Sequence, residues 1–220
     1  MKKLNKDNSG CKDVFHAFLV EKVRYAGKYD FPVIKEEHIV PRRCILFSDA
    51  IKEKNDYAQW VVFYEYDYLF ERVWNNPKKY IEILKRFEGV VSPDFSVYYD
   101  MPFAMQIWNI YRSRVIGAWL QNNGIRVIPN IRYGIDDTFD IVCDGISKHS
   151  VISIGSLGCI KKLDYRSYFE KGLEYIARKL EPETIFIYGC APQNTKEIKK
   201  LGINVVIYKP EFFHSRKGVK

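Results

Sequence analysis

Gly89-Val90-Val91-Ser92-Pro93-Asp94-Phe95 is an apolar segment that ends in a proline and a carboxylate. A helical pattern follows from about Pro102 to Asn122, and Gly124 stops it, as glycine often does just past the end of a helix. A strand that runs through a turn into a helix is the repeating unit of α/β proteins. The segment therefore predicts one such unit, with polar groups where the strand ends.

The same unit recurs on both sides of this segment. Upstream, the pattern predicts a strand at 60–66, a helix through 69–74, and a second helix with Asn76 as its N-cap and Pro77 at its first position. Residues 138–146 fit either a short helix or a strand. The other predicted elements are a short strand at 44–47, strands at 125–133, 151–154, 184–188 and 204–208, and helices at 164–180 and 195–201.

Strands that alternate with helices argue for a parallel sheet with right-handed crossovers. The strand count fits a small (β/α) barrel, which we prefer because polar turn residues recur at nearly every strand end; an open doubly wound sheet is the alternative. We expect a single α/β domain at 41–210. A partly flexible N-terminal extension at 1–40 would precede it, and a basic tail at 211–220 would follow it.

The bulk composition fits a folded cytoplasmic protein. Hydrophobic residues make up 47 % of the chain, and no stretch approaches the roughly 20 apolar residues of a membrane span. The net charge of +8 invites a nucleic-acid ligand, but the first ten and the last ten residues each carry +2, so the rest is only mildly basic. The N-terminus lacks the apolar run of a signal peptide, and the five cysteines form no CxxC pair, which favours free thiols.

Two carboxylates are the candidate catalytic residues. Asp94 stands at the end of a strand, where α/β proteins place ligand sites, and Asp100 follows six positions later. Together they could hold Mg²⁺, with Asp94 as the metal ligand, or serve as acid and base. The alternatives are structural: Asp94 would bond local backbone N–H groups in a turn, and Asp100 would favour the start of the following helix.

The long helix carries a candidate anion-binding residue. Arg112 falls in the middle of an apolar helical face, and a buried guanidinium needs either a protein carboxylate or an anionic ligand. Arg114 is off that face, so we expect it to be exposed. Asn130 and Arg132 close another strand. If that strand neighbours the one ending at Asp94, these groups share one rim, either as an ion-pair network or as an anion-binding site.

A glycine-containing loop, Gly155-Ser156-Leu157-Gly158, follows a strand and precedes a helix, with Lys161 nearby. Backbone N–H groups in such a loop can approach a phosphate, so Ser156, Gly158 and Lys161 are candidate ligand-binding residues. The loop matches neither a P-loop nor a nucleophile elbow, and a tight structural turn is the alternative. The four histidines lie outside the strand ends, and the aromatic residues Trp60, Tyr64, Trp74 and Trp119 are expected in the core.

Several short motifs are distributed along most of the chain. They are Phe70–Pro77, Ser92-Pro93-Asp94-Phe95-Ser96, Asp100-Met101-Pro102, Gln106-Ile107-Trp108-Asn109 with Tyr111-Arg112, Val127–Arg132 and Gly158-Cys159-Ile160-Lys161. Through these motifs, the chain from about Trp60 to Tyr208 resembles the family called domain of unknown function 4417. Tyr133 departs from the family pattern, where Trp is expected. The resemblance implies a cytoplasmic protein of bacteria, their phages or mobile elements, and it carries over no activity and no catalytic residue.

Two functions are consistent with these features. In the first, a phage or mobile-element protein binds, and in an enzymatic version processes, a phosphate-bearing small molecule or nucleic acid at the carboxyl-terminal rim of the strands. In the second, the chain is a non-enzymatic protein that binds a host or phage protein; its polar rim is then an ion-pair network and its surplus of aromatic residues anchors an interface. Neither reading involves a membrane. The sequence leaves open whether the protein is an enzyme and which cofactor it uses.

Overall fold

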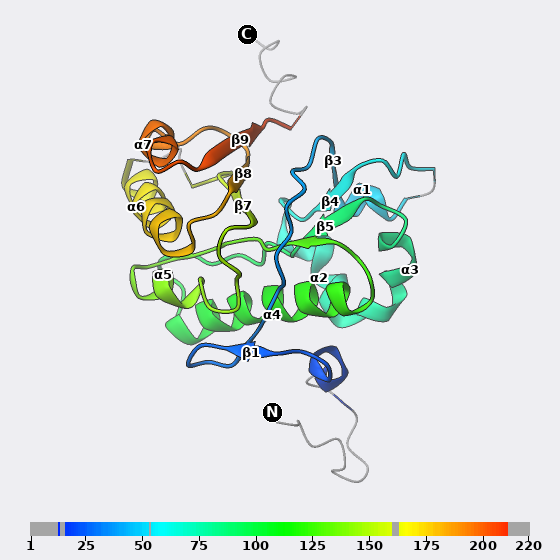
Figure 1. Cartoon of the computed structure of the whole chain (residues 1–220). Coiled ribbons are helices and arrows are strands. Elements are labelled where there is room, and N and C mark those ends of the chain that lie inside the picture. Colours follow the sequence, from blue (N-terminus) through cyan, green and yellow to red (C-terminus); the bar gives the residue numbers. More distant parts are fainter. Residues whose placement is uncertain (1–12, 14–15, 53, 160–162, 211–220) are drawn as a thin grey trace.

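The computed structural model describes residues 13, 16–52, 54–159 and 163–210 (Figure 1). The predicted basic tail at 211–220, most of the first fifteen residues and the candidate ligand residue Lys161 lie outside this range.

Seven parallel strands form the centre of the molecule. Four of them make one sheet in chain order: β3 (Cys44–Leu46), β4 (Trp60–Val62), β5 (Gly89–Val91) and β6 (Val127–Ile128). The other three make a second sheet, again in chain order: β7 (Val151–Gly155), β8 (Thr184–Tyr188) and β9 (Asn204–Tyr208). A single parallel bridge between Asn130 and Ser153 joins the two sheets. The predicted parallel α/β fold is confirmed.

The preferred closed barrel is not what forms, and the open-sheet alternative fits the observed strand pairing. Within the described residues no ladder pairs β9 with β3. The edges are linked instead by the Tyr208 hydroxyl, which lies 3.3 Å from the backbone nitrogen of Cys44. Because a side chain rather than a backbone group meets the edge of β3, the backbone hydrogen bonds that would close a barrel are not made.

Helices connect the strands, and most occur where the sequence predicts them. In Figure 1, α4 runs beneath the strands, while α6 and α7 lie beside β7–β9. A short antiparallel ribbon of β1 (Tyr25–Ala26) and β2 (Phe31–Pro32) precedes the parallel strands. The helices are η1 (Ala17–Val20), α1 (Phe47–Ala50), α2 (Asp67–Asn75), η2 (Pro77–Lys79), α3 (Ile81–Leu84), α4 (Phe103–Asn122), α5 (Asp137–Ile141), α6 (Leu163–Leu180) and α7 (Thr195–Lys200).

Three local predictions need correction or refinement. Asn76 makes no side-chain cap, and the helix predicted after it is a 3₁₀ turn followed by one α-helical turn, although Pro77 does begin it. The ambiguous segment at 138–146 contains α5, so it is helical at its start. The predicted strand at 125–133 keeps a regular ladder only at Val127–Ile128. Beyond it, the Asn130 nitrogen donates to the Ser92 side-chain hydroxyl, and Pro129 has no backbone N–H to donate toward β7.

Alternation along the strands divides the core into layers. In β4, Val61 faces one hydrophobic cluster with α4, while Trp60 and Val62 face another that also contains residues of β7 and β8. The backbone of β5 packs tightly against the Trp60 ring, since a Cβ on Gly89 would lie 2.4 Å from that ring. Among the described residues, no helix is both long and apolar enough to cross a bilayer.

Candidate functional site

Asp94 lies in a network of buried polar side chains beyond the carboxyl ends of β5 and β6. The register that pairs Val91 with Ile128 brings the segments after the two strands together. Asp94 is 7 % exposed, and its Oδ1 accepts hydrogen bonds from Asn130 Nδ2 at 2.7 Å and Arg132 Nε at 2.9 Å. Arg132 Nη2 donates to the other oxygen. The two strands are neighbours, which meets the condition left open by the sequence, and three of the candidate residues meet.

Tyr64 extends the network toward the second sheet. Its hydroxyl donates to Asn130 Oδ1 at 3.0 Å and shares a short hydrogen bond with the Ser153 hydroxyl of β7. Its ring stacks on Tyr188 of β8, with centroids 4.7 Å apart. Burial, followed by the nearby charge of Asp94, raises the pKa of Tyr64 well above its usual value, so the hydroxyl remains a donor. The sequence predicts Tyr64 in the core but not its hydrogen bonds.

Arg132 reaches across to the loop that follows β7. Its Nη1 lies 3.4 Å from the Gly155 carbonyl oxygen and 3.0 Å from Cys159 Sγ. Burial opposes its charge, but Asp94 and Cys159 outweigh burial and raise the pKa of Arg132 above its usual value. Gly155 is required here, because a Cβ would lie 2.7 Å from the Tyr64 ring and 3.1 Å from Arg132 Nη2.

This arrangement does not offer a ligand set to Mg²⁺. Magnesium needs several oxygen ligands in near-octahedral geometry. Both carboxylate oxygens of Asp94 accept hydrogen bonds from Arg132, whose positive charge opposes a cation. In the described parts of the chain, no group of three His, Cys, Asp or Glu side chains converges as a metal site would. The metal-binding role of Asp94 stays a prediction, and we derive no chemical step from it.

Asp100 is not part of the network. It is exposed in the turn before α4. A different carboxylate contacts the segment after β5: Asp67, the first residue of α2, accepts from the Ser96 backbone nitrogen at 3.0 Å and from its hydroxyl at 2.7 Å. The sequence indicated that a strand ends near Asp67 but gave no reason to connect it with Ser96.

Arg112 has a protein carboxylate as its partner, which is the structural alternative for this residue. It is 9 % exposed, and its Nη1 forms an ion pair with Glu71 of α2. Its Nη2 donates to Asn109 Oδ1 at 2.8 Å, and the guanidinium lies 3.9 Å from the centroid of the Phe95 ring. No bond joins it to the Asp94 network in the described residues, so the candidate arginines occupy two separate places.

The expectation that Arg114 is exposed is wrong. Arg114 is 1 % exposed and donates to the carbonyl oxygens of Asn130, Val142 and Asp144. Burial lowers the pKa of Arg114 to about 10. The position of Arg114 on the helix predicted a side chain exposed to solvent, but α5 and the segment after β6 pack over this side of α4. The side chain therefore ties α4 to two backbone segments.

The loop after β7 is held by hydrogen bonds to the loop after β8. The buried Ser156 hydroxyl donates to the Cys190 carbonyl oxygen and accepts from the Cys190 nitrogen, both at 2.8 Å. Gly158 adopts a left-handed conformation, with φ of 79°, and faces open space. Lys161 lies outside the described residues. The predicted phosphate-binding roles of Ser156, Gly158 and Lys161 stay predictions, and the Ser156 bonds fit the structural-turn alternative.

Exposed tyrosines lie in the segments that follow β4 and β5. We call Tyr66, Tyr68, Tyr98 and Tyr99 the tyrosine rim; their exposed fractions are 75, 73, 59 and 47 %. The first pair flanks the start of α2 and the second follows β5, and the Asp67–Ser96 hydrogen bonds connect the two segments. Tyr66 and Tyr68 stack with centroids 6.0 Å apart, and Tyr99 packs on Tyr165 of α6 at 5.1 Å. The rim thus consists of two segments that the Asp67–Ser96 hydrogen bonds hold together.

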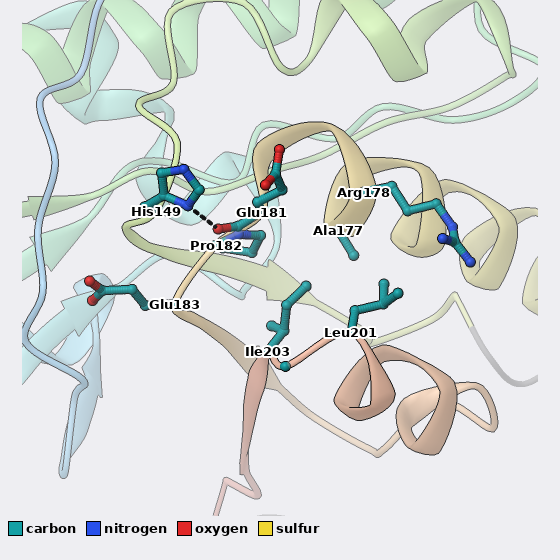
Figure 2. Close-up of a pocket in the computed structure, with 9 residues that line it drawn as sticks. His149, Ala177, Arg178, Glu181, Pro182, Glu183, Leu201 and Ile203 are labelled. Carbon is teal, nitrogen blue, oxygen red and sulfur yellow. Dashed lines mark hydrogen bonds between the residues drawn. The ribbon is translucent and has the colours of Figure 1, made fainter.

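A surface hollow lies at the opposite ends of the strands. Figure 2 shows it between the end of α6, the start of β8 and the turn before β9, with His149 bonded to the Glu181 carbonyl oxygen. Its charged groups have protein partners: Glu181 pairs with Lys148, Arg178 with Glu174, and Glu183 with His38. These pairs are exposed, so the hollow offers no buried polar group to a ligand.

The fold and the network define an open, parallel α/β protein whose strand ends carry buried, mutually bonded polar groups. The chain belongs to the family described as Domain of unknown function (DUF4417), which matches residues 23–209. The family predicted from the sequence motifs is therefore confirmed.

Two curated relatives come from bacteriophages. The chain is 31 % identical over 183 residues to the "Gene 1 protein" of Mycobacterium phage L5, which covers 80 % of this chain and 79 % of the relative. It is 34 % identical over 183 residues to the "Gene 1 protein" of Mycobacterium phage D29, covering 80 % of this chain and 67 % of the relative. No solved structure matches the chain. The expected phage association of the family is borne out by these relatives.

Proposed function

We propose that this protein is a non-enzymatic, phage-type factor that acts in the bacterial cytoplasm by binding another protein through its tyrosine rim. The observation that carries the proposal is the exposure of Tyr66, Tyr68 and Tyr98, each more than half accessible, in the segments that follow β4 and β5. Tyrosine is enriched at protein interfaces, because it buries a large ring while its hydroxyl stays hydrated. Clustered exposed aromatic side chains mark interaction sites.

The buried network supports this role as a scaffold. Asp67 fixes the start of α2 to the segment after β5, and Arg112 fixes α2 to α4 through Glu71. The Asp94–Arg132 pair holds the segments after β5 and β6 together. A rim carried by bonded segments loses less conformational entropy when it meets a partner, which favours tight binding.

Binding of a phosphate-bearing ligand, the other function predicted from the sequence, has weaker support. Arg132 would have to leave Asp94, and Arg112 would have to leave Glu71. Ser156 would have to release the backbone of Cys190. Each exchange replaces a bond already made in the protein, so the ligand gains little from it. The protein-binding function requires none of these exchanges.

Affinity capture with matched variants tests the proposal. The tagged protein is used to recover partners from bacterial lysate, and each candidate partner is then purified and rebound directly. We expect a direct partner whose binding is lost when Tyr66, Tyr68 and Tyr98 are replaced by Ser. A control carrying Tyr29→Ser and Ile39→Ser, which are 36 and 41 % exposed in the segment before β3, should bind normally.

The phosphate function is tested in parallel by thermal shift with nucleotides and short oligonucleotides, with and without Mg²⁺. A ligand that binds only the folded state at one hundred times its Kd stabilises it by about 2.7 kcal/mol. A shift of this size that disappears in Arg132→Gln would overturn the protein-binding proposal. Equal recovery of the direct partner by the rim variant and the control would also overturn it.

A further inference from the structure

Carboxylates are interleaved with the tyrosines of the rim. Glu65 precedes Tyr66, Asp67 separates Tyr66 from Tyr68, and Asp100 follows Tyr99. In the portion of the chain that the structure describes, none of these three carboxylates forms an ion pair. The rim therefore combines aromatic area with three carboxylates, of which Glu65 also lies within the electrostatic influence of Arg72, although the whole chain has a net charge of +8.

Hydrogen bonds hold two of these carboxylates, Glu65 and Asp67, in fixed positions. Glu65 is half-buried and accepts a hydrogen bond from the Ser48 nitrogen at 2.9 Å, together with one from the Ser48 hydroxyl. Asp67 is fixed by Ser96, and Asp100 is exposed beside the tyrosines of the second segment. A charge held in place by neutral donors keeps its attraction for an incoming cation.

The aromatic faces suit a cation as well. The Tyr66 and Tyr68 rings lie nearly parallel, with an interplanar angle of 14°. The chain already uses this chemistry in two places, because Arg112 lies 3.9 Å from the centroid of Phe95 and Arg86 lies 3.9 Å from the centroid of Tyr57. Guanidinium groups bind aromatic faces and nearby carboxylates at once, whereas phosphates are repelled by the carboxylates.

From this charge complementarity we infer that the partner presents a cationic, arginine-bearing segment to the tyrosine rim. The inference rests on the proposed function and adds the chemistry of the partner. The inferred partner of the rim is a basic protein segment. Binding of a nucleic acid or of a second copy of this chain at the rim would overturn the inference.

A peptide titration tests the charge and ring requirements. The probe is a twelve-residue peptide of alternating Arg and Gly-Ser units, compared with a Glu version of the same length and with a twelve-nucleotide oligothymidine. We expect the Arg peptide alone to bind, with an affinity that falls as salt is raised. Asp100→Asn and Tyr66→Ser should each weaken binding by about tenfold.

The matched control is Glu82→Gln, an exposed carboxylate of α3 whose partner is Lys85, and it should change binding less than twofold. Because Asp100 is exposed, its substitution should leave the fold intact, and far-ultraviolet circular dichroism checks the folding of each variant. Equal weakening by the control, preferred binding of the oligonucleotide, or self-association abolished by the rim variants would overturn the inference. If the carboxylate variants capture the direct partner normally while the tyrosine variants do not, the proposed function stands and the cationic partner is wrong.

Discussion

Arg132 binds both carboxylate oxygens of Asp94, with Nε directed at Oδ1 over 2.9 Å and Nη2 directed at Oδ2. The side chains are 18 and 7 % exposed, so the pair is largely removed from water. The planar guanidinium matches the carboxylate in this two-point geometry, which a lysine could not reproduce. The pair joins the segments after two neighbouring strands and explains why both residue types stand at the strand ends.

Breaking this pair should be costly, and removing both partners should cost less than the sum. We expect Asp94→Asn and Arg132→Gln each to lower the free energy of unfolding by about 3–5 kcal/mol, since each leaves a buried charge without its partner. The double variant should show a coupling energy of at least about 1 kcal/mol. Urea denaturation of the four proteins measures it. If each single substitution cost less than about 1 kcal/mol and the two costs simply added, the pair would not stabilise the fold, and the two groups would instead be available for a ligand.

The sequence placed Asp94 and Arg132 at the ends of two strands, but it brought them together only on the condition that those strands are neighbours, and the pairing of β5 with β6 meets that condition. Other features depend on tertiary contacts, which the periodicity of the sequence does not predict. Tyr66 belongs to an aromatic run that favours a strand at 60–66, yet the ladder ends at Val62 and Tyr66 is largely exposed. Barrel closure depends on how β9 meets β3, where the Tyr208 side chain intervenes. Sequence spacing cannot determine such long-range packing.

Tyr64 and Tyr66 are two positions apart, but loss of the hydroxyl should destabilise the protein at Tyr64 and have almost no effect at Tyr66. Tyr64→Phe leaves Asn130 Oδ1 without its donor and breaks the short bond to Ser153, so we expect a loss of about 1–3 kcal/mol. Tyr66→Phe, at a side chain that is 75 % exposed, should change stability by less than about 0.5 kcal/mol. Thermal and urea unfolding compare the two variants. A neutral Tyr64→Phe would mean that its hydroxyl contributes nothing to the network.

Arg114 should tolerate neither removal nor conservative replacement. Its guanidinium uses all three nitrogens to satisfy three backbone carbonyl oxygens, and a lysine ammonium, whose donors share one nitrogen, cannot span all three. We expect Arg114→Lys to lose about 2 kcal/mol or more and Arg114→Met to lose at least as much. Arg178, an exposed arginine of α6 paired with Glu174, provides the control, and Arg178→Lys should be close to neutral. Similar melting temperatures for all the variants would contradict the structural role of Arg114.

Cys143 should make stability depend on alkaline pH. It is 6 % exposed, and burial raises the pKa of its thiol from 9.0 to about 12. Below pH 9 the thiol is protonated in both the folded and unfolded states. As the pH rises above 9, only the unfolded state loses this proton, so the folded state loses stability relative to it. By pH 10 the loss from this one group should be about 1 kcal/mol. Cys143→Ala removes the titration, so the stability difference between wild type and variant should narrow by this amount between pH 8 and pH 10. Urea denaturation at the two pH values measures the difference, and a constant difference would show that the Cys143 thiol titrates alike in both states.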